Sequence, residues 1–329
     1  MRTTTVDRRR LLTLALGTTA GALCALTGQP ASSQERTVRF ILPNATGSGV
    51  DAITRAAQPA LAKALGHAVI VDNQAGAGGV VGLQALARSP ADGFTLSVVS
   101  NNVVIFPSVL KSVPFDMPGD FTPIAIVGYT PIVLVVHPKV AATNAREFSA
   151  LLKARGGELN YASGGNGTIL HLAAEMFLDE AGAKARHIPY KGVGPMLTDL
   201  IGGQVQFATA ALPSVQQHLA SGALRAIGVA TRERVAAAPA IPTFAEQGMP
   251  GYDVEAWFAV IGPKGLPPAE VQRIHAAVVS AFSAPAVKET MARQGNVINV
   301  QPADRAMPFF RSELARYAQL VKKAGVEAQ

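Results

Sequence analysis

Two glycine-rich turns carry residue types that bind anions. The first spans residues 43–51 (PNATGSGVD) and the second residues 161–171 (YASGGNGTILH), and each joins a predicted strand to a predicted helix. Such a turn points backbone N–H groups and the positive end of the helix at an anion. One turn in each half of the chain predicts a ligand with a carboxylate at each end, or with a carboxylate and an amine. The candidate ligand-binding residues in these turns are Asn44, Ala45, Thr46, Gly47, Ser48, Gly49, Asp51, Ser163, Gly164, Asn166, Gly167, Thr168 and His171.

The first turn also fits a different ligand, a dinucleotide. Residues 47–52 match the pattern G-x-G-x-x-A, and Asp72 ends the next strand at about the place of a ribose-binding acid. Asp51 argues against this, because its carboxylate would repel a pyrophosphate at the start of the helix. A purely structural role, capping the helix, is the alternative for Asp51. An exported nicotinamide-dependent oxidoreductase is therefore the alternative function.

Other catalytic groups are scarce. The single cysteine is Cys24, which lies in the segment that we expect to be removed. The six histidines are scattered without the spacing of a metal site such as H-E-x-x-H. We expect no catalytic residues, no metal and no cofactor. The protein is therefore not expected to be an enzyme. Lys191 is expected on the solvated surface, and Trp257 could stack on a ligand or pack in the core.

The elements that must position these turns alternate between strand and helix. Apolar runs predict strands at residues 38–43, 69–72 and 95–100, with helices at 51–65 and 80–88 between them. The same rhythm restarts after residue 147, with strands at 159–162, 205–210 and 224–229 and helices at 147–155 and 168–181. This order predicts an α/β fold with doubly wound, mostly parallel sheets and ligand sites at the carboxyl ends of the strands.

Two β-branched stretches are placed to pass between the halves. Residues 124–136 and residues 256–261 form these stretches, and the chain is helical again at 270–283 and 309–323. Two passages predict two lobes with a discontinuous first lobe, formed by residues 34–130 and 258–329 around a second lobe of residues 131–257. A hinge between the lobes would close over a ligand in the cleft.

The first 33 residues have the pattern of a signal peptide. Residues 1–10, which include four arginines, precede an apolar run at residues 11–17. The small residues Ala31, Ser32 and Ser33 suit cleavage after Ser33. Arg8, Arg9 and Arg10 resemble a twin-arginine signal, with Sec export as the alternative. An uncleaved membrane anchor is a further alternative. We expect a periplasmic protein whose formal charge falls from +7 to +4, because four arginines and one aspartate leave with the leader. No basic run remains for a nucleic-acid partner.

Six short segments spread along the chain carry a family resemblance. They are residues 73–79 (NQAGAGG), 90–96 (PADGFTL), 159–167 (LNYASGGNG), 187–192 (HIPYKG), 199–205 (DLIGGQV) and 256–258 (AWF). With them the chain resembles the periplasmic receptors of tripartite tricarboxylate transporters, known as the Bug family. The resemblance implies a two-lobed, Venus-flytrap periplasmic binding protein that takes a small carboxylate, an amino acid or an aromatic acid. We expect the receptor to be a monomer. It also implies presentation to a membrane permease, with a sensor as the alternative recipient.

The first turn departs from the family pattern. That turn usually reads P-F-x-P-G-G, whereas Asn44, Thr46 and Ser48 stand here in place of the aromatic residue, the proline and a glycine. An acid that is common after the late strand is also missing from residues 206–213. Our hypothesis is a polar carboxylate whose second group meets Asn44, Thr46 or Asn101.

Overall fold

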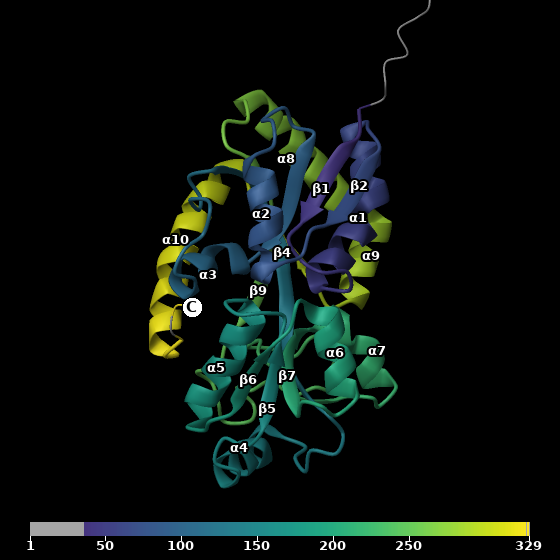
Figure 1. Ribbon diagram of the computed structural model, residues 1–329. Coiled ribbons are helices and arrows are strands. Elements are labelled where there is room, and N and C mark those ends of the chain that lie inside the picture. Colours follow the sequence, from purple (N-terminus) through teal and green to yellow (C-terminus); the bar gives the residue numbers. More distant parts are fainter. Residues whose placement is uncertain (1–35, 327, 329) are drawn as a thin grey trace, which may run out of the picture. The chain divides into compact units, whose positions relative to one another are not determined.

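One long strand, β4 (Phe121–Val136), runs through both halves of the molecule (Figure 1). The computed structural model describes residues 36–326 and residue 328. Of the two β-branched stretches expected to cross between the halves, residues 124–136 lie in this strand and residues 256–261 lie in β9 (Glu255–Pro263). The first part of β4 pairs antiparallel with β9, and its last five residues pair with β7 (Phe207–Ala211) and β8 (Arg225–Val229). The partner changes between Pro131 and Ile132, so β4 connects the two halves directly.

Lobe 1 is the part of the fold built on the N-terminal strands. β1 (Val38–Leu42) lies between β2 (Val69–Asn73) and β3 (Thr95–Ser100) and pairs parallel with both. β9 then joins β3 to β4 with antiparallel pairing, and the short β10 (Val297–Ile298) adds to β4. The helices of this lobe are α1 (Gly49–Leu65), α2 (Val80–Ala87), α3 (Asn102–Val109), α8 (Pro268–Ser283), α9 (Pro285–Arg293) and α10 (Ala303–Lys323), with a short 3₁₀ turn at Ala77–Gly79.

Lobe 2 repeats the parallel arrangement. β5 (Asn160–Ser163) pairs parallel with β6 (Arg186–Pro189) on one side and with β7 on the other. Its helices are α4 (Ala145–Ala154), α5 (Ile169–Ala181), α6 (Val193–Ile201) and α7 (Leu212–Ala220). The predicted α/β fold is confirmed, with parallel pairing inside each lobe and antiparallel pairing where the crossing strands join them. The predicted lobe boundaries after residues 130 and 257 stay predictions.

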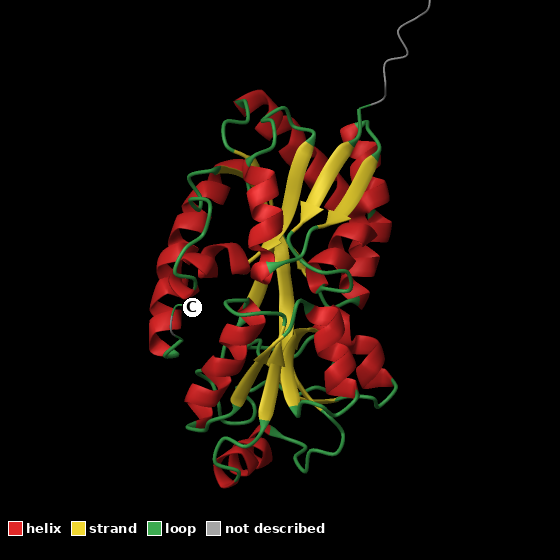
Figure 2. Ribbon diagram, viewed as in Figure 1, coloured by secondary structure: helices red, strands yellow, loops and turns green. Residues whose placement is uncertain are grey.

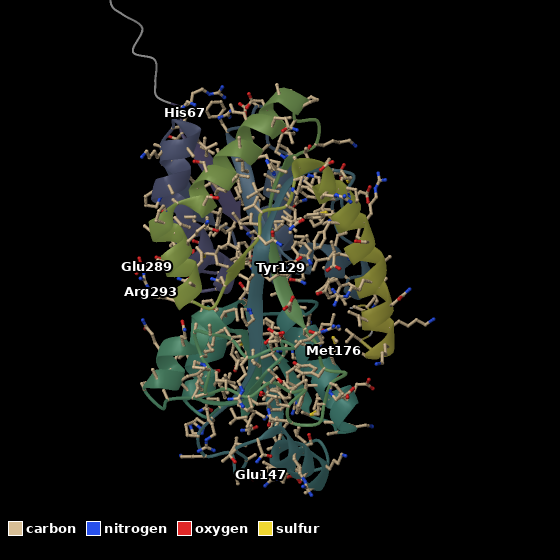
Figure 3. The ribbon with its side chains drawn as sticks, turned by 180° about the vertical axis from the view of Figure 1, so that it is seen from behind. His67, Tyr129, Glu147, Met176, Glu289 and Arg293 are labelled. Carbon is tan, nitrogen blue, oxygen red and sulfur yellow. The ribbon has the colours of Figure 1, made fainter. Side chains whose placement is uncertain are left out.

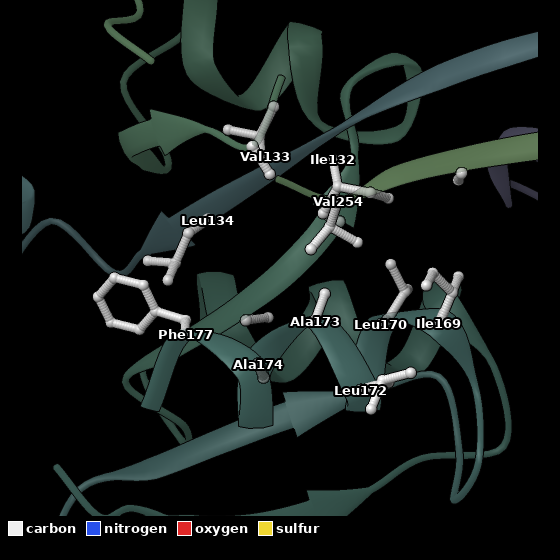
Figure 4. Packing of buried hydrophobic residues seen from close by; sticks show 14 of the residues in the cluster. Ile132, Val133, Leu134, Ile169, Leu170, Leu172, Ala173, Ala174, Phe177 and Val254 are labelled. Carbon is white, nitrogen blue, oxygen red and sulfur yellow. The ribbon is translucent and has the colours of Figure 1, made fainter. Parts of the chain in front are cut away.

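Helices cover both faces of the strands (Figure 2). In lobe 1, α1 packs against α8, while α10 packs against β4 and α3. In lobe 2, α5 packs against β7 and β5. Leu170 and Phe177 of this helix belong to the same buried cluster as Ile132 and Leu134 of β4 (Figure 4), so the apolar end of β4 lies in the core of lobe 2. Among residues 36–326 and 328, no helix has both the length and the apolar character needed to cross a membrane.

The predicted leader and its cleavage near Ser33 lie outside the described residues. The compact unit of the fold begins at Thr37. Seen from behind, Tyr129 lies near the middle of the molecule on β4, and His67 and Glu147 lie near its two opposite ends (Figure 3). Tyr129 thus marks the level at which the strand passes from one lobe to the other.

Buried polar bonds lock the crossing strands to the C-terminal helix. Asn101, at the end of β3, is fully buried; its Oδ1 accepts from the backbone N–H of Trp257 at 2.9 Å. Its amide group donates to the carbonyl of Glu255 at 3.2 Å and to the hydroxyl of Tyr317 on α10. The indole N–H of Trp257 donates to Glu313, also on α10, at 2.8 Å. β3, β9 and α10 are therefore joined by one network.

This network predicts a large stability cost for Asn101→Ala. The substitution leaves the Trp257 N–H and the Tyr317 hydroxyl buried without their partner, which should lower the free energy of unfolding by about 2–4 kcal/mol. Urea unfolding measures the change. Asn299→Ala, at an exposed asparagine in the same lobe, is the control, and we expect it to stay within about 0.5 kcal/mol of the wild type. Equal effects of the two substitutions would contradict the assignment.

Candidate functional site

A cavity between the lobes is lined by the first residues of three helices. Gly49 and Val50 of α1 come from lobe 1, whereas Ile169 of α5 and Val193 of α6 come from lobe 2. All three helices follow parallel strands, β1, β5 and β6, so the cavity lies at the carboxyl ends of the strands, as an open α/β sheet predicts. The first N–H groups of a helix have no acceptor within it. The cavity therefore gathers backbone donors from both lobes.

The first turn is shaped to leave donors free at the cavity. The N-cap residue Ser48 accepts from the N–H of Asp51 at 3.2 Å through its hydroxyl. Gly49 and Val50, which have no intrahelical acceptor, line the cavity. A Cβ atom on Gly49 would lie 2.9 Å from the Cβ of Ala211 in lobe 2, closer than side-chain carbons pack. Glycine at this position lets lobe 2 approach the helix end.

Asp51 serves the turn itself. Its Oδ2 accepts from the N–H of Gly47 at 3.0 Å, and its Oδ1 accepts from Arg55 at 2.9 Å and from Asn73 at 3.0 Å. The carboxylate is buried and is not part of the cavity lining. The N-cap of α1 is Ser48, so Asp51 supports the turn from the first turn of the helix and does not cap it. Asp72, the expected ribose acid, pairs with Arg39, whose guanidinium holds the pKa of Asp72 below its usual value.

The second turn opens α5 and reaches across to lobe 1. Thr168 caps the helix, because its hydroxyl oxygen accepts from the N–H of His171 at 3.3 Å and its hydroxyl donates to the carbonyl of Gly165 at 2.9 Å. The N–H of Ile169 donates to Oδ1 of Asn102 on α3 at 2.8 Å. This bond between the lobes occupies the first amide of α5. The next residue, Leu170, also lines the cavity and has no intrahelical acceptor for its N–H.

The third helix end, at α6, was not among the predicted site residues. Gly192 is its N-cap, with φ at 129°, a conformation that strongly favours glycine. A Cβ atom there would lie 2.6 Å from that of Ala45 in lobe 1. Lys191 precedes it and lines the cavity. Among the described residues that line the cavity, the exposed Lys191 is the one charged member, and no Asp or Glu contributes.

The lobes meet on both sides of the cavity. Besides the close approach of Ala45 to Gly192, a Cβ atom on Gly78 would lie 3.1 Å from the carbonyl oxygen of Asn166. The hydroxyl of Ser214 on α7 donates to the carbonyl of Gly47 at 3.1 Å. Turns from the two lobes are therefore in contact around the cavity.

The structure brings together part of the predicted set. The predicted residues that line the cavity are Asn44, Ala45, Ser48, Gly49, Gly164 and Thr168. Those that lie outside the lining are Thr46, Gly47, Asp51, Asn101, Ser163, Asn166, Gly167 and His171. Thr46 is exposed, and Asn101 is held in the network with Trp257. Lys191, Asn102, Thr130 and Trp257 line the cavity without having been in the predicted set.

Two stacked imidazoles lie behind the second turn. The rings of His171 and His187 are 4.0 Å apart between centroids and nearly parallel, at 7°. Nε2 of His187 is 2.7 Å from the hydroxyl of Ser163, and Nδ1 of His171 accepts from the N–H of Gly167 at 3.3 Å. Burial lowers the pKa of His171 to about 4. Burial, with the His171 ring beside it, lowers the pKa of His187 to about 3. Both rings are therefore neutral at neutral pH.

The comparison with protein families decides what kind of protein this is. A family model described as tripartite tricarboxylate transporter family receptor matches residues 53–326. The chain belongs to this receptor family. Its members are solute-binding receptors that work with a transporter, and the family is not one of enzymes.

Individual members of the receptor family align over nearly the whole chain. BugT of Bordetella pertussis is 36% identical over 294 residues, which cover 89% of this chain and 90% of BugT. An R. palustris protein solved with adipate has a TM-score of 0.86 at 27% identity, covering 90% of this chain and all of that one. MatC from Rhodopseudomonas palustris, solved with bound malate, has a TM-score of 0.80 at 27% identity, covering 87% and 99%. The predicted family and its two-lobed periplasmic-binding-protein fold are confirmed.

The imidazole stack predicts that stability falls in acid. Because the pKa of each ring is lower in the folded protein than the usual 6.5, the unfolded chain takes up protons first as the pH falls below that value. The free energy of unfolding should therefore decrease between pH 6.5 and pH 4. The decrease from His171 alone should be about 3 kcal/mol. Urea unfolding from pH 7.5 to 4.5 measures this loss.

Variants separate the stack from other titrating groups. The double variant His171→Phe, His187→Phe should have a flatter stability profile over this pH range, because no imidazole remains to be protonated on unfolding. Phe177→Leu, at a buried ring of the same helix as His171, removes no titrating group and should lower stability without flattening the profile. A double variant with the wild-type slope would contradict the assignment.

Proposed function

We propose that the protein is a periplasmic receptor that closes its two lobes over a small dicarboxylate and presents it to a permease of the tripartite tricarboxylate type. The observation that carries the proposal is the convergence of three helix N-termini, from both lobes, on a cavity to which the described part of the chain contributes one lysine and no acid. Helix N-termini and a lysine both favour negative charge. A ligand with two carboxylates would use donors on both sides of the cavity.

The lack of an acid in the lining argues against an amino acid as ligand. A buried ammonium group needs a carboxylate or several acceptors, and desolvating it without them is costly. The cavity instead offers apolar surface from Ile132, Trp257 and Phe258, which suits a hydrocarbon body between two carboxylates. Adipate and malate, the ligands named for the two related structures, are both dicarboxylates.

Our hypothesis named Asn44, Thr46 or Asn101 as the partner of the ligand's second group, and the structure favours Asn44. It lines the cavity, whereas Thr46 is exposed and Asn101 is engaged elsewhere. Oδ1 of Asn44 is buried and has no hydrogen-bond partner among the described residues. Rotation of the amide would turn this oxygen to the cavity, where a ligand hydroxyl could donate to it. A hydroxylated dicarboxylate such as malate is therefore our first choice over adipate.

Export and partners complete the proposal. The basic and apolar pattern of residues 1–33 supports cleavage of a signal peptide near Ser33. Receptors of this family work with a transporter, which supports a membrane permease as the partner, and we infer that the receptor itself is a monomer. A sensor would receive the same closed, ligand-bound form.

Lys191 provides the direct test of the ligand class. Calorimetry with malate, adipate, aspartate and benzoate should give the tightest binding for malate or adipate, the two dicarboxylates without an ammonium group. Lys191→Gln should weaken that binding about 10- to 100-fold, because it removes a charge-assisted hydrogen bond worth about 1.5–3 kcal/mol. Lys184→Gln, at an exposed lysine outside the cavity lining, is the matched control. Preference for aspartate, or equal binding by the two lysine variants, would overturn the proposal.

A further inference from the structure

The imidazole stack lies directly behind the turn that lines the cavity. Neither His171 nor His187 is part of the lining, whereas Gly164, between their contacts at Ser163 and Gly167, and Thr168, next to Gly167, are. His171 is on α5 and His187 is on β6, so the stack joins two elements of lobe 2 beneath the turn. The rings therefore sit where they can set the shape of the turn without touching a ligand.

Each ring holds one end of the turn. His187 bonds the hydroxyl of Ser163, which also accepts from the N–H of Gly165 at 3.2 Å, at the start of the turn. His171 accepts from the N–H of Gly167, at its end. Glycines in the turn have little conformational preference of their own, and Gly165 and Gly167 both have positive φ. The hydrogen bonds to the rings therefore add to those of Thr168 with the Gly165 carbonyl in ordering the turn.

The residues around the imidazole stack favour one tautomer of His171. Tyr161 on β5 stacks on His187 with ring centroids 4.8 Å apart, and its hydroxyl donates to Glu175 on α5. Nε2 of His171 lies 3.9 Å from the same carboxylate. Nδ1 of His171 must remain unprotonated to accept from Gly167, which places the proton of the neutral ring on Nε2, toward Glu175. The bond from Gly167 thus favours this tautomer, and the carboxylate of Glu175 lies on the side of its proton.

We propose that His171 and His187 are positioning residues for ligand binding, which hold residues 163–168 in the conformation that presents the start of α5 to the cavity. The proposal rests on the proposed function, because it takes this turn as part of the ligand site. The acceptor atom at the position of Nδ1 of His171, rather than the ring as a packing element, is what the turn needs.

Two substitutions separate the acceptor from the ring. His171→Asn retains an oxygen near the position of Nδ1 and loses the stack, whereas His171→Phe retains a stacked ring and loses the acceptor. Malate affinity should stay within about threefold of wild type in His171→Asn and fall by about tenfold or more in His171→Phe. The melting temperature should be lower for His171→Asn. Affinity and stability would then follow opposite orders, which packing alone does not produce.

Phe177→Leu is the control for stability. Phe177 is fully buried on the same helix, two turns beyond the histidine, and its truncation should lower the melting temperature with little change in malate affinity. If malate affinity instead follows melting temperature across all three variants, the positioning role is overturned.

A measurement without ligand keeps this test separate from the proposed function. Amide hydrogen exchange in a peptide covering residues 163–171 should be faster in His171→Phe than in wild type, and near the wild-type rate in His171→Asn. His187→Phe and His187→Gln form a second such pair for the Ser163 contact. Failure of the wild type to bind malate or adipate would count against the dicarboxylate assignment alone. Equal exchange in the Phe and amide variants would overturn the positioning role.

Discussion

The site depends on one constraint, which is that an anion buried between two lobes must receive donors from both of them. The lining offers a single charged side chain, Lys191, so backbone N–H groups at helix starts supply the rest. Such groups are fixed by the helices and carry no protons that titrate near neutral pH. A site of this kind recognises the carboxylate itself and leaves the choice of ligand to the residues around it.

The fold meets this constraint through β4. Because the strand belongs to both sheets, the parallel strands of the two lobes are held with their carboxyl ends toward one cavity. Close approach then requires small residues at the contact points. Gly49 faces Ala211 and Gly192 faces Ala45, and in both places an added Cβ atom would collide with the other lobe. The glycines of the turns thus serve closure as well as turn geometry.

The sequence predicted what local patterns determine. The strands, the crossing segments and the two turns follow from apolar runs and glycine placement, and the structure has them within a few residues of the predicted bounds. The start of α6 was missed because its N-cap is a glycine with no capping side chain, although Tyr190-Lys191-Gly192 was visible in the family segment. Asn101 and Asn102 are adjacent, and only long-range packing sends the first to Trp257 and the second to the cavity. His171 was predicted to bind the ligand, whereas the structure places it behind the turn.

A crystal structure of the protein with malate tests the central claim most directly. The account predicts carboxylate oxygens within about 2.7–3.2 Å of the N–H groups of Gly49 or Val50 on one side and of Leu170 or Val193 on the other, directly or through one water. The second carboxylate should lie beside Lys191. Malate held by side chains of one lobe alone, or bound outside this cavity, would contradict the account.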